Sequence, residues 1–109
     1  RIFSLVLLYL NNSIIMKKID HVAIVVNDIE ESITYYTNNY DCKIIHADKT
    51  WGFLQFANIK LALVLEGKHP PHLAFEVDSV DGVRHRDGSI SKYIHDPSDN
   101  AIELIEYPK

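Results

Sequence analysis

Apolar residues follow two different spacings along this chain. Over 29–38, Ile29 and Ile33 recur at a helical interval, and Asp28 lies three residues before Glu31, the spacing of a capping box with Asp in the cap position. The other apolar runs are short and are separated by turn residues, which is typical of strands. The pattern therefore predicts one helix and strands over 18–26, 42–47, 50–56, 59–65, 72–77, 91–95 and 101–107, with a polar loop over 78–88. The first strand, 18–26, is apolar on both faces, so we expect it to be buried on both.

Several of these predicted strands form an internal repeat. The run His21-Val22-Ala23-Ile24-Val25-Val26 matches His72-Leu73-Ala74-Phe75-Glu76-Val77, and residues 59–64 match residues 100–105. His21 thus corresponds to His72, and Ala62 corresponds to Glu103. In the second copy the matched positions lie about ten residues closer together, because the copy lacks a segment where its helix would be. We therefore expect two similar units, about 17–66 and 70–107, the second without most of its helix.

The composition indicates one small globular domain. The chain has 109 residues, of which 47% are hydrophobic and 24% charged, and this length excludes two full-sized domains. A domain of this size buries a smaller share of its surface than a larger domain does, so we expect a homodimer. The formal charge is −4 and the basic residues are scattered, so we expect no nucleic acid as a partner. The single cysteine, Cys42, cannot form an internal disulfide and suits a reducing cytoplasm.

Residues 1–15 form an apolar extension ahead of the patterned segment. Residues 2–10 are almost all apolar, but a helix of this length reaches about 14 Å against the roughly 30 Å of a hydrocarbon core, so we expect no membrane partner. The stretch is also a poor match to a signal peptide. Met16 stands just before the patterned part, and we interpret 16–109 as the domain. We expect residues 2–10 to cover the apolar face that the missing helix would leave bare, in cis or from a partner subunit.

Three motifs in this order resemble the vicinal oxygen chelate superfamily, which includes glyoxalase I, bleomycin-resistance proteins and extradiol dioxygenases. They are Asp20-His21-Val22-Ala23-Ile24-Val25-Val26 with the capped helix after it, then His72-Leu73-Ala74-Phe75-Glu76-Val77, and finally Asp96-Pro97-Ser98-Asp99-Asn100-Ala101-Ile102-Glu103-Leu104. The last is similar to the family's DPxGNxxEL motif, with Asp99 in place of glycine. The resemblance runs from about residue 18 to 107. It implies an α+β fold in which paired βαβββ modules form a half-open barrel.

The resemblance also implies a metal site. Family members that bind metal take their ligands from the first and the last strand of each module. These positions correspond here to His21, His72 and Glu103, while the fourth is Ala62, which has no donor atom. Two imidazoles and a carboxylate suit manganese, iron, nickel or zinc, and three protein ligands leave positions open for a small-molecule ligand.

A metal-free arrangement of the same residues is the alternative. His21 and His72 would then be neutral and bonded to backbone groups, and Glu103 would pair with Arg84 or Arg86 in the polar loop. The physical argument for a cation is that an uncompensated carboxylate in an apolar cavity is costly.

Residues near the predicted site suggest contacts with a substrate. Trp51, Phe53 and Gln55 alternate on one strand, so they share a face and could bind substrate, with core or dimer packing as the alternative. Tyr93 could donate a hydrogen bond to a bound oxyanion and act as a catalytic residue together with Glu103; ordinary strand packing is the alternative.

Two functions follow from these features. The first is a glyoxalase-like, metal-dependent enzyme of lyase, isomerase or dioxygenase type, in which a Lewis acid stabilises an enolate or oxyanion of a small oxygen-chelating substrate. The second is a metal-free protein that binds or sequesters a small molecule, as bleomycin-resistance proteins do. The presence or absence of a bound divalent metal separates the two.

Overall fold

The computed structural model describes residues 17–109. This part of the chain forms eight strands and one helix, which confirms the α+β class, and it contains no helix that is long and apolar enough to cross a membrane. The predicted extension 1–15 and its expected role as a cover lie outside the described residues. The elements are β1 (Lys18–Val26), α2 (Ile29–Asn39), β2 (Lys43–Ala47), β3 (Trp51–Gln55), β4 (Lys60–Leu65), β5 (His72–Glu76), β6 (Val83–Arg84), β7 (Ile90–His95) and β8 (Ala101–Glu106).

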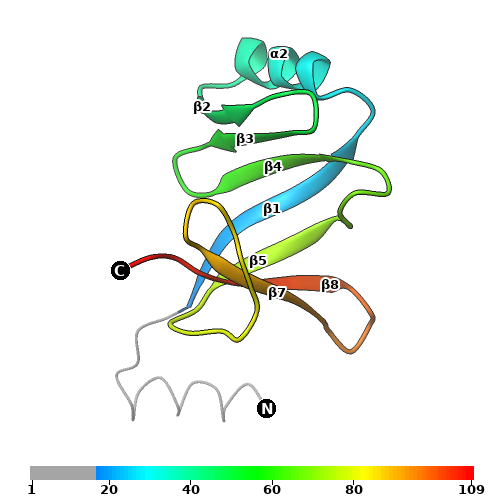
Figure 1. Cartoon of the computed structure of the whole chain (residues 1–109). Helices are drawn as coiled ribbons and strands as arrows, with labels where there is room; N and C mark the ends of the chain where they lie inside the picture. The colour runs from blue at the N-terminus through cyan, green and yellow to red at the C-terminus, as the bar shows by residue number, and fades with distance from the viewer. Residues whose placement is uncertain (1–16) are drawn as a thin grey trace, which may run out of the picture.

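All eight strands belong to one sheet, in the order β2-β3-β4-β1-β5-β8-β7-β6. β1 and β5 pair antiparallel at its centre, and each is joined in parallel to the last strand of its own unit, β4 or β8. The two halves therefore repeat the same strand pairing, as the sequence repeat predicts. The outermost strands, β2 and β6, do not pair with each other, so the sheet twists but does not close into a barrel (Figure 1).

α2 packs on one face of the first half of the sheet (Figure 1). The helix begins after Asp28, whose side chain accepts a hydrogen bond of 2.9 Å from the backbone N–H of Glu31, as the capping spacing predicts. Its apolar stripe then meets β3 and β4. The buried residues of this core are Ile29, Ile33, Leu54 and Leu63.

No helix within residues 17–109 covers the corresponding face of the second half, which fits the predicted loss of the second helix. Leu73, Ile102 and Ile94 lie beside one another in register on this face. Leu73 is 38% exposed and Ile94 is 40% exposed. Ile19 and Val25 of β1 are also exposed, so the prediction that the first strand is buried on both faces is wrong at these positions. α2 covers only one face of one half of the sheet.

The segment 78–88, predicted as a polar loop, contains the short strand β6. Val83 and Arg84 pair with Ser91 and Ile90 of β7. Two residues are too few to produce a periodic pattern in a sequence, so this strand could not be predicted from hydropathy.

Gly52 of β3 lies directly beneath α2, and this contact generates a test of the core. A Cβ atom added at Gly52 would lie 3.0 Å from Cδ1 of Ile33 and 3.3 Å from Cγ2 of Ile29. We expect Gly52→Val to lower the free energy of unfolding by about 1–3 kcal/mol, measured by chemical denaturation, because the helix must shift to admit the side chain. Ala47→Val is the control, because Ala47 pairs with Gly52 but is exposed. Equal stabilities of the two variants would contradict this packing.

Candidate metal centre

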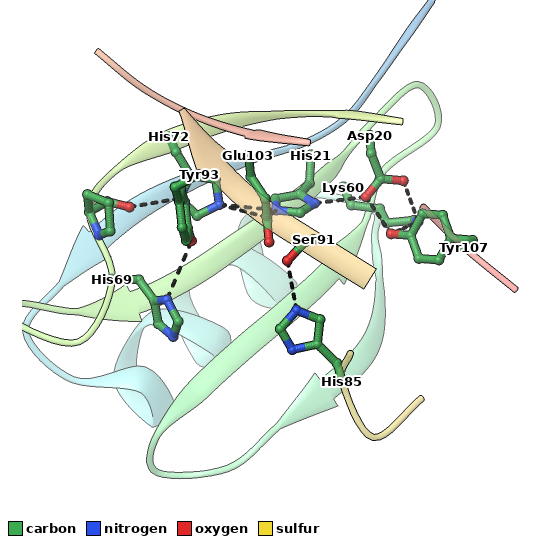
Figure 2. Close-up of polar contacts among 11 residues, drawn as sticks. Asp20, His21, Lys60, His69, His72, His85, Ser91, Tyr93, Glu103 and Tyr107 are labelled. Atoms are coloured by element: carbon green, nitrogen blue, oxygen red, sulfur yellow. Dashed lines mark hydrogen bonds and ion pairs between the residues drawn. The ribbon is translucent and has the colours of Figure 1, made fainter. Parts of the chain in front are cut away.

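Strand register gathers three polar side chains on one face of the sheet. Ala74 lies beside both His21 of β1 and Glu103 of β8, and His72 lies two residues before Ala74 on β5. Because side chains alternate along a strand, His21, His72 and Glu103 share this face, which is opposite to α2 and is called the inner face below. Figure 2 shows their side chains pointing toward one another.

The three side chains form a compact triangle of potential ligand atoms. Nε2 of His21 lies 3.3 Å from Nε2 of His72, and Oε1 of Glu103 lies 3.1 Å from the first nitrogen and 3.2 Å from the second. All three residues are buried, with exposed fractions of 6%, 8% and 9%. The structure thus brings together the residues predicted as ligands, while their binding of a metal stays a prediction.

The outer nitrogens of both imidazoles face groups that can only accept hydrogen bonds. Nδ1 of His72 lies 2.8 Å from the carbonyl oxygen of Pro70, and Nδ1 of His21 lies 2.8 Å from Oδ2 of Asp20. Each Nδ1 therefore carries the proton of the neutral ring, and each Nε2 presents a lone pair to the triangle. Two lone pairs and a carboxylate oxygen then converge with no donor between them. Such a group needs either an added proton or a cation at its centre.

The same contacts shift the pKa values of the site. Burial would lower the pKa of His21, but its hydrogen bonds to Asp20 and Glu103 outweigh this effect and raise the pKa above its usual value. Burial would raise the pKa of Glu103, but the contacts with the two imidazoles, which can donate to it once a ring takes up a second proton, and the contact with Ser91 hold it far below its usual range. The centre of the triangle is therefore a position at which positive charge is stabilised.

The dimensions of the triangle fit a divalent metal ion. Metal–ligand bonds of about 2.1 Å that meet at angles of about 90–110° place the ligand atoms roughly 3.0–3.4 Å apart. The three observed separations of 3.1–3.3 Å fall in this range. Two nitrogen donors and one oxygen donor also suit first-row transition metals better than calcium or magnesium, because the latter two ions prefer oxygen ligands alone.

The fourth ligand position of the family corresponds to a small apolar side chain. Ala62 is buried and lies in register between Ala23 of β1 and Phe53 of β3 on the inner face. It offers no donor atom, so a cation bound by the triangle would have several coordination positions open on this side.

Tyr93 of β7 stands directly beside the triangle (Figure 2). It pairs with Glu103 in register, and its ring packs edge-on against His72 with ring centroids 5.1 Å apart. Its hydroxyl lies 3.5 Å from Nδ1 of His72 and 3.5 Å from Nδ1 of His69. Burial, and secondarily the charge of Glu103, raise the pKa of Tyr93 to about 12, so the hydroxyl keeps its proton at neutral pH and is a hydrogen-bond donor.

The residues predicted to bind substrate lie at different distances from the triangle. Phe53 packs edge-on against His21, with centroids 5.3 Å apart. Trp51 lies one step further out, against Phe53, and the ring of His46 stacks on it at 4.2 Å. Gln55 does not reach the triangle, since its amide donates to the backbone oxygen of Phe56 at 2.6 Å.

Several polar residues around the site were not predicted from the sequence. Asp20, Lys60 and Tyr107 form a hydrogen-bonded group behind His21, and the only local signal is that Asp20 directly precedes His21. Strict alternation would place these two side chains on opposite faces of the strand. A register shift between Ile19 and His21 instead leaves Asp20 as the extra residue of a β-bulge, and its side chain reaches the inner face.

The expected alternative partners of Glu103 do not contact it. Arg84 donates to the backbone oxygen of Gly88, and no ion pair within residues 17–109 joins Glu103 to an arginine. Ser91, which is buried, is the further partner of Glu103, and its Oγ lies 2.7 Å from Nε2 of His85.

Solved structures of low sequence identity share this fold. A hypothetical protein from Bacillus halodurans is 18% identical, with a TM-score of 0.69 over 87% of this chain and 97% of that chain. A Streptomyces coelicolor methylmalonyl-CoA epimerase variant in complex with 2-nitronate-propionyl-CoA is 18% identical, with a TM-score of 0.67 over 87% and 100%. Methylmalonyl-CoA epimerase from Mycobacterium tuberculosis is 22% identical, with a TM-score of 0.65 over 84% and 89%. No curated protein matches the chain in sequence.

The family itself is established by sequence. The family model of the Glyoxalase/Bleomycin resistance protein/Dioxygenase superfamily matches residues 18–86, which is more than half of the chain and includes β1, α2 and β5. The closing motif around Glu103 lies beyond the matched residues, but its strand pairs with β5 as the second unit requires. This chain belongs to the Glyoxalase/Bleomycin resistance protein/Dioxygenase superfamily.

Proposed function

We propose that this chain is a metal-dependent enzyme in which His21, His72 and Glu103 hold one divalent cation. The observation that carries the proposal is the convergence of two imidazole lone pairs and a carboxylate oxygen at 3.1–3.3 Å with no donor between them. Manganese, iron, nickel and zinc all accept this donor set. A cation held by these residues would supply a Lewis acid, which would stabilise the negative charge that develops on the oxygens of a small substrate.

The chain's own residues would then position the substrate and handle protons. Tyr93 keeps its hydroxyl proton at neutral pH and donates a hydrogen bond to a developing oxyanion at the edge of the triangle. Glu103 has a second carboxylate oxygen and is the predicted catalytic carboxylate of the triangle, although its lowered pKa makes it a weak general base in the metal-free protein. Phe53 and Trp51 provide an apolar wall on the β3 side of the inner face, and we assign them to the non-reacting part of the substrate. The amide of Gln55 is bonded to the backbone of Phe56, so we assign Gln55 to the outer edge of the substrate-binding surface.

The reaction we favour is isomerisation by removal of a proton next to a carbonyl group. Structures that share the fold include methylmalonyl-CoA epimerases, one of them in complex with methylmalonyl-CoA. Lyase and dioxygenase reactions also develop negative charge on a substrate oxygen, and they are the other two reaction types that we consider. We also propose that the chain acts as a cytoplasmic homodimer, because no helix within residues 17–109 covers the apolar row Leu73, Ile102 and Ile94; the free thiol of Cys42 is compatible with that compartment.

Metal content tests the proposal directly. Protein purified without chelator or nickel resin should contain stoichiometric manganese, iron, nickel or zinc by mass spectrometry of the metals. His21→Ala and His72→Ala should each lose it, because two remaining donors hold such ions weakly. His95→Ala is the matched control, since His95 is exposed at the end of β7. A metal-free protein that cannot be loaded would refute the enzyme proposal and leave the small-molecule binding protein.

The raised pKa of His21 predicts the pH dependence of metal binding. A metal must displace the proton that the triangle favours, so zinc affinity should fall as the pH drops through the raised pKa of His21, and binding should release protons. The folding stability of the metal-free protein should show the opposite trend and increase as the pH drops. The protonated ring beside Glu103 contributes stability below the usual imidazole pKa, and this contribution is lost as the pH rises through the raised value. Calorimetry in buffers of different ionisation enthalpy measures the proton release, and its absence would contradict this electrostatic account.

The reaction type can be tested with methylmalonyl-CoA as the probe. The metal-loaded protein should exchange the hydrogen next to the thioester carbonyl for deuterium from solvent, as followed by NMR. Tyr93→Phe should slow the exchange by about 10²-fold while keeping the metal, because one oxyanion donor is removed. Tyr35→Phe, on the exposed surface of α2, should have no effect. A metal-loaded protein without any exchange would exclude this substrate and keep the metal centre.

A further inference from the structure

We propose that Asp20, Lys60 and Tyr107 form a positioning network that holds His21 in the tautomer and orientation needed to bind the metal. The inference rests on the proposed metal centre and concerns residues that do not themselves reach the triangle. They lie on the opposite side of the His21 ring from His72 and Glu103 (Figure 2). They are therefore positioning residues rather than catalytic ones.

Asp20 is the centre of this network. Its Oδ2 accepts hydrogen bonds from Nδ1 of His21 at 2.8 Å and from the hydroxyl of Tyr107 at 2.6 Å, and its Oδ1 accepts one from Nζ of Lys60 at 2.9 Å. The side chain of Asp20 is only 5% exposed. A carboxylate with so little water around it stays ionised and fixed because three donors surround it.

Each donor comes from a different part of the fold. Lys60, the first residue of β4, pairs with His21 in register, and Tyr107 follows the last residue of β8. The ammonium group of Lys60 also lies 4.9 Å from the ring centroid of Tyr107 and 5.6 Å from that of Phe53. These contacts keep the ammonium group beside Asp20 and away from the centre of the triangle.

The network decides which nitrogen of His21 carries the proton. A carboxylate cannot donate, so Asp20 keeps the proton on Nδ1 and leaves a lone pair on Nε2. Without this acceptor, the proton could move to Nε2 and be donated to Oε1 of Glu103, which lies 3.1 Å away. A neutral ring in that tautomer places a hydrogen atom at the position where the metal would bind. Removing the acceptor therefore weakens metal binding without touching a ligand.

The other imidazole differs in a way that makes the inference testable. Nδ1 of His72 is held by the backbone oxygen of Pro70, which no side-chain substitution removes. His21 is thus the histidine of the triangle whose tautomer depends on side chains. Asp48 provides a matched comparison, since its Oδ2 lies 2.8 Å from Nε2 of His46 in an exposed pair of the same kind away from the triangle.

The experiment measures zinc affinity by competition with a chromogenic chelator in the full chain. Asp20→Asn should weaken zinc binding by about 10–100-fold, and Tyr107→Phe and Lys60→Met by smaller factors in the same direction. Asp48→Asn should leave the affinity unchanged. Wild-type affinity in Asp20→Asn and in Tyr107→Phe would overturn the inference while leaving the metal centre in place.

A second measurement separates positioning from mere folding. Nitrogen-15 NMR of the histidine rings in metal-free protein, at an alkaline pH where His21 is neutral, should show the proton on Nδ1 in the wild type. In Asp20→Asn a substantial fraction should move to Nε2, and Tyr107→Phe, which keeps the ring and its packing, should shift the balance in the same direction. An unchanged tautomer in both variants would overturn the inference. This readout holds even if the wild type binds no zinc, which would refute the proposed function alone.

Discussion

The convergence of three hydrogen-bond acceptors at one point is the constraint on which the arrangement of this protein depends. Two imidazole lone pairs and the Glu103 carboxylate meet at 3.1–3.3 Å inside a site with little access to water. Acceptors do not attract one another, so the arrangement needs a positive charge among them. A shared proton can supply it, and a metal ion supplies it more fully because it also accepts further ligands on the open side.

The sheet holds the three side chains of the triangle rigidly in this arrangement. The triangle uses one strand of the first repeat and two of the second, and β1 and β5 join the repeats at the centre of the sheet. Because the ligands come from strands, the loss of the second helix does not disturb them. Within residues 17–109 it instead leaves the outer face of the second half without a covering helix, and Leu73 and Ile94 are exposed there. The face that carries the triangle and the apolar face opposite to it are thus two sides of the same strands.

The three ligand side chains are supported in different ways. A backbone carbonyl holds His72, a network of three side chains holds His21, and Ser91 contacts Glu103. A backbone contact persists through most substitutions, whereas side-chain contacts can change one residue at a time. The properties of the proposed metal centre would therefore be tuned mainly through the surroundings of His21 and Glu103.

The sequence by itself determined the succession of strands in each repeat and the helix over 29–38, and its resemblance to the family singled out His21, His72 and Glu103 as ligand candidates. Periods of two and 3.6 residues and an internal repeat are local properties, so they can be read without coordinates. Only the tertiary structure decided the side of the strand that Asp20 faces, because the bulge arises from its pairing with β5. It also decided that Lys60 and Tyr107, 40 and 87 residues away, meet Asp20. Contacts over such distances depend on how strands pair across the sheet, and no local pattern in the chain encodes that pairing.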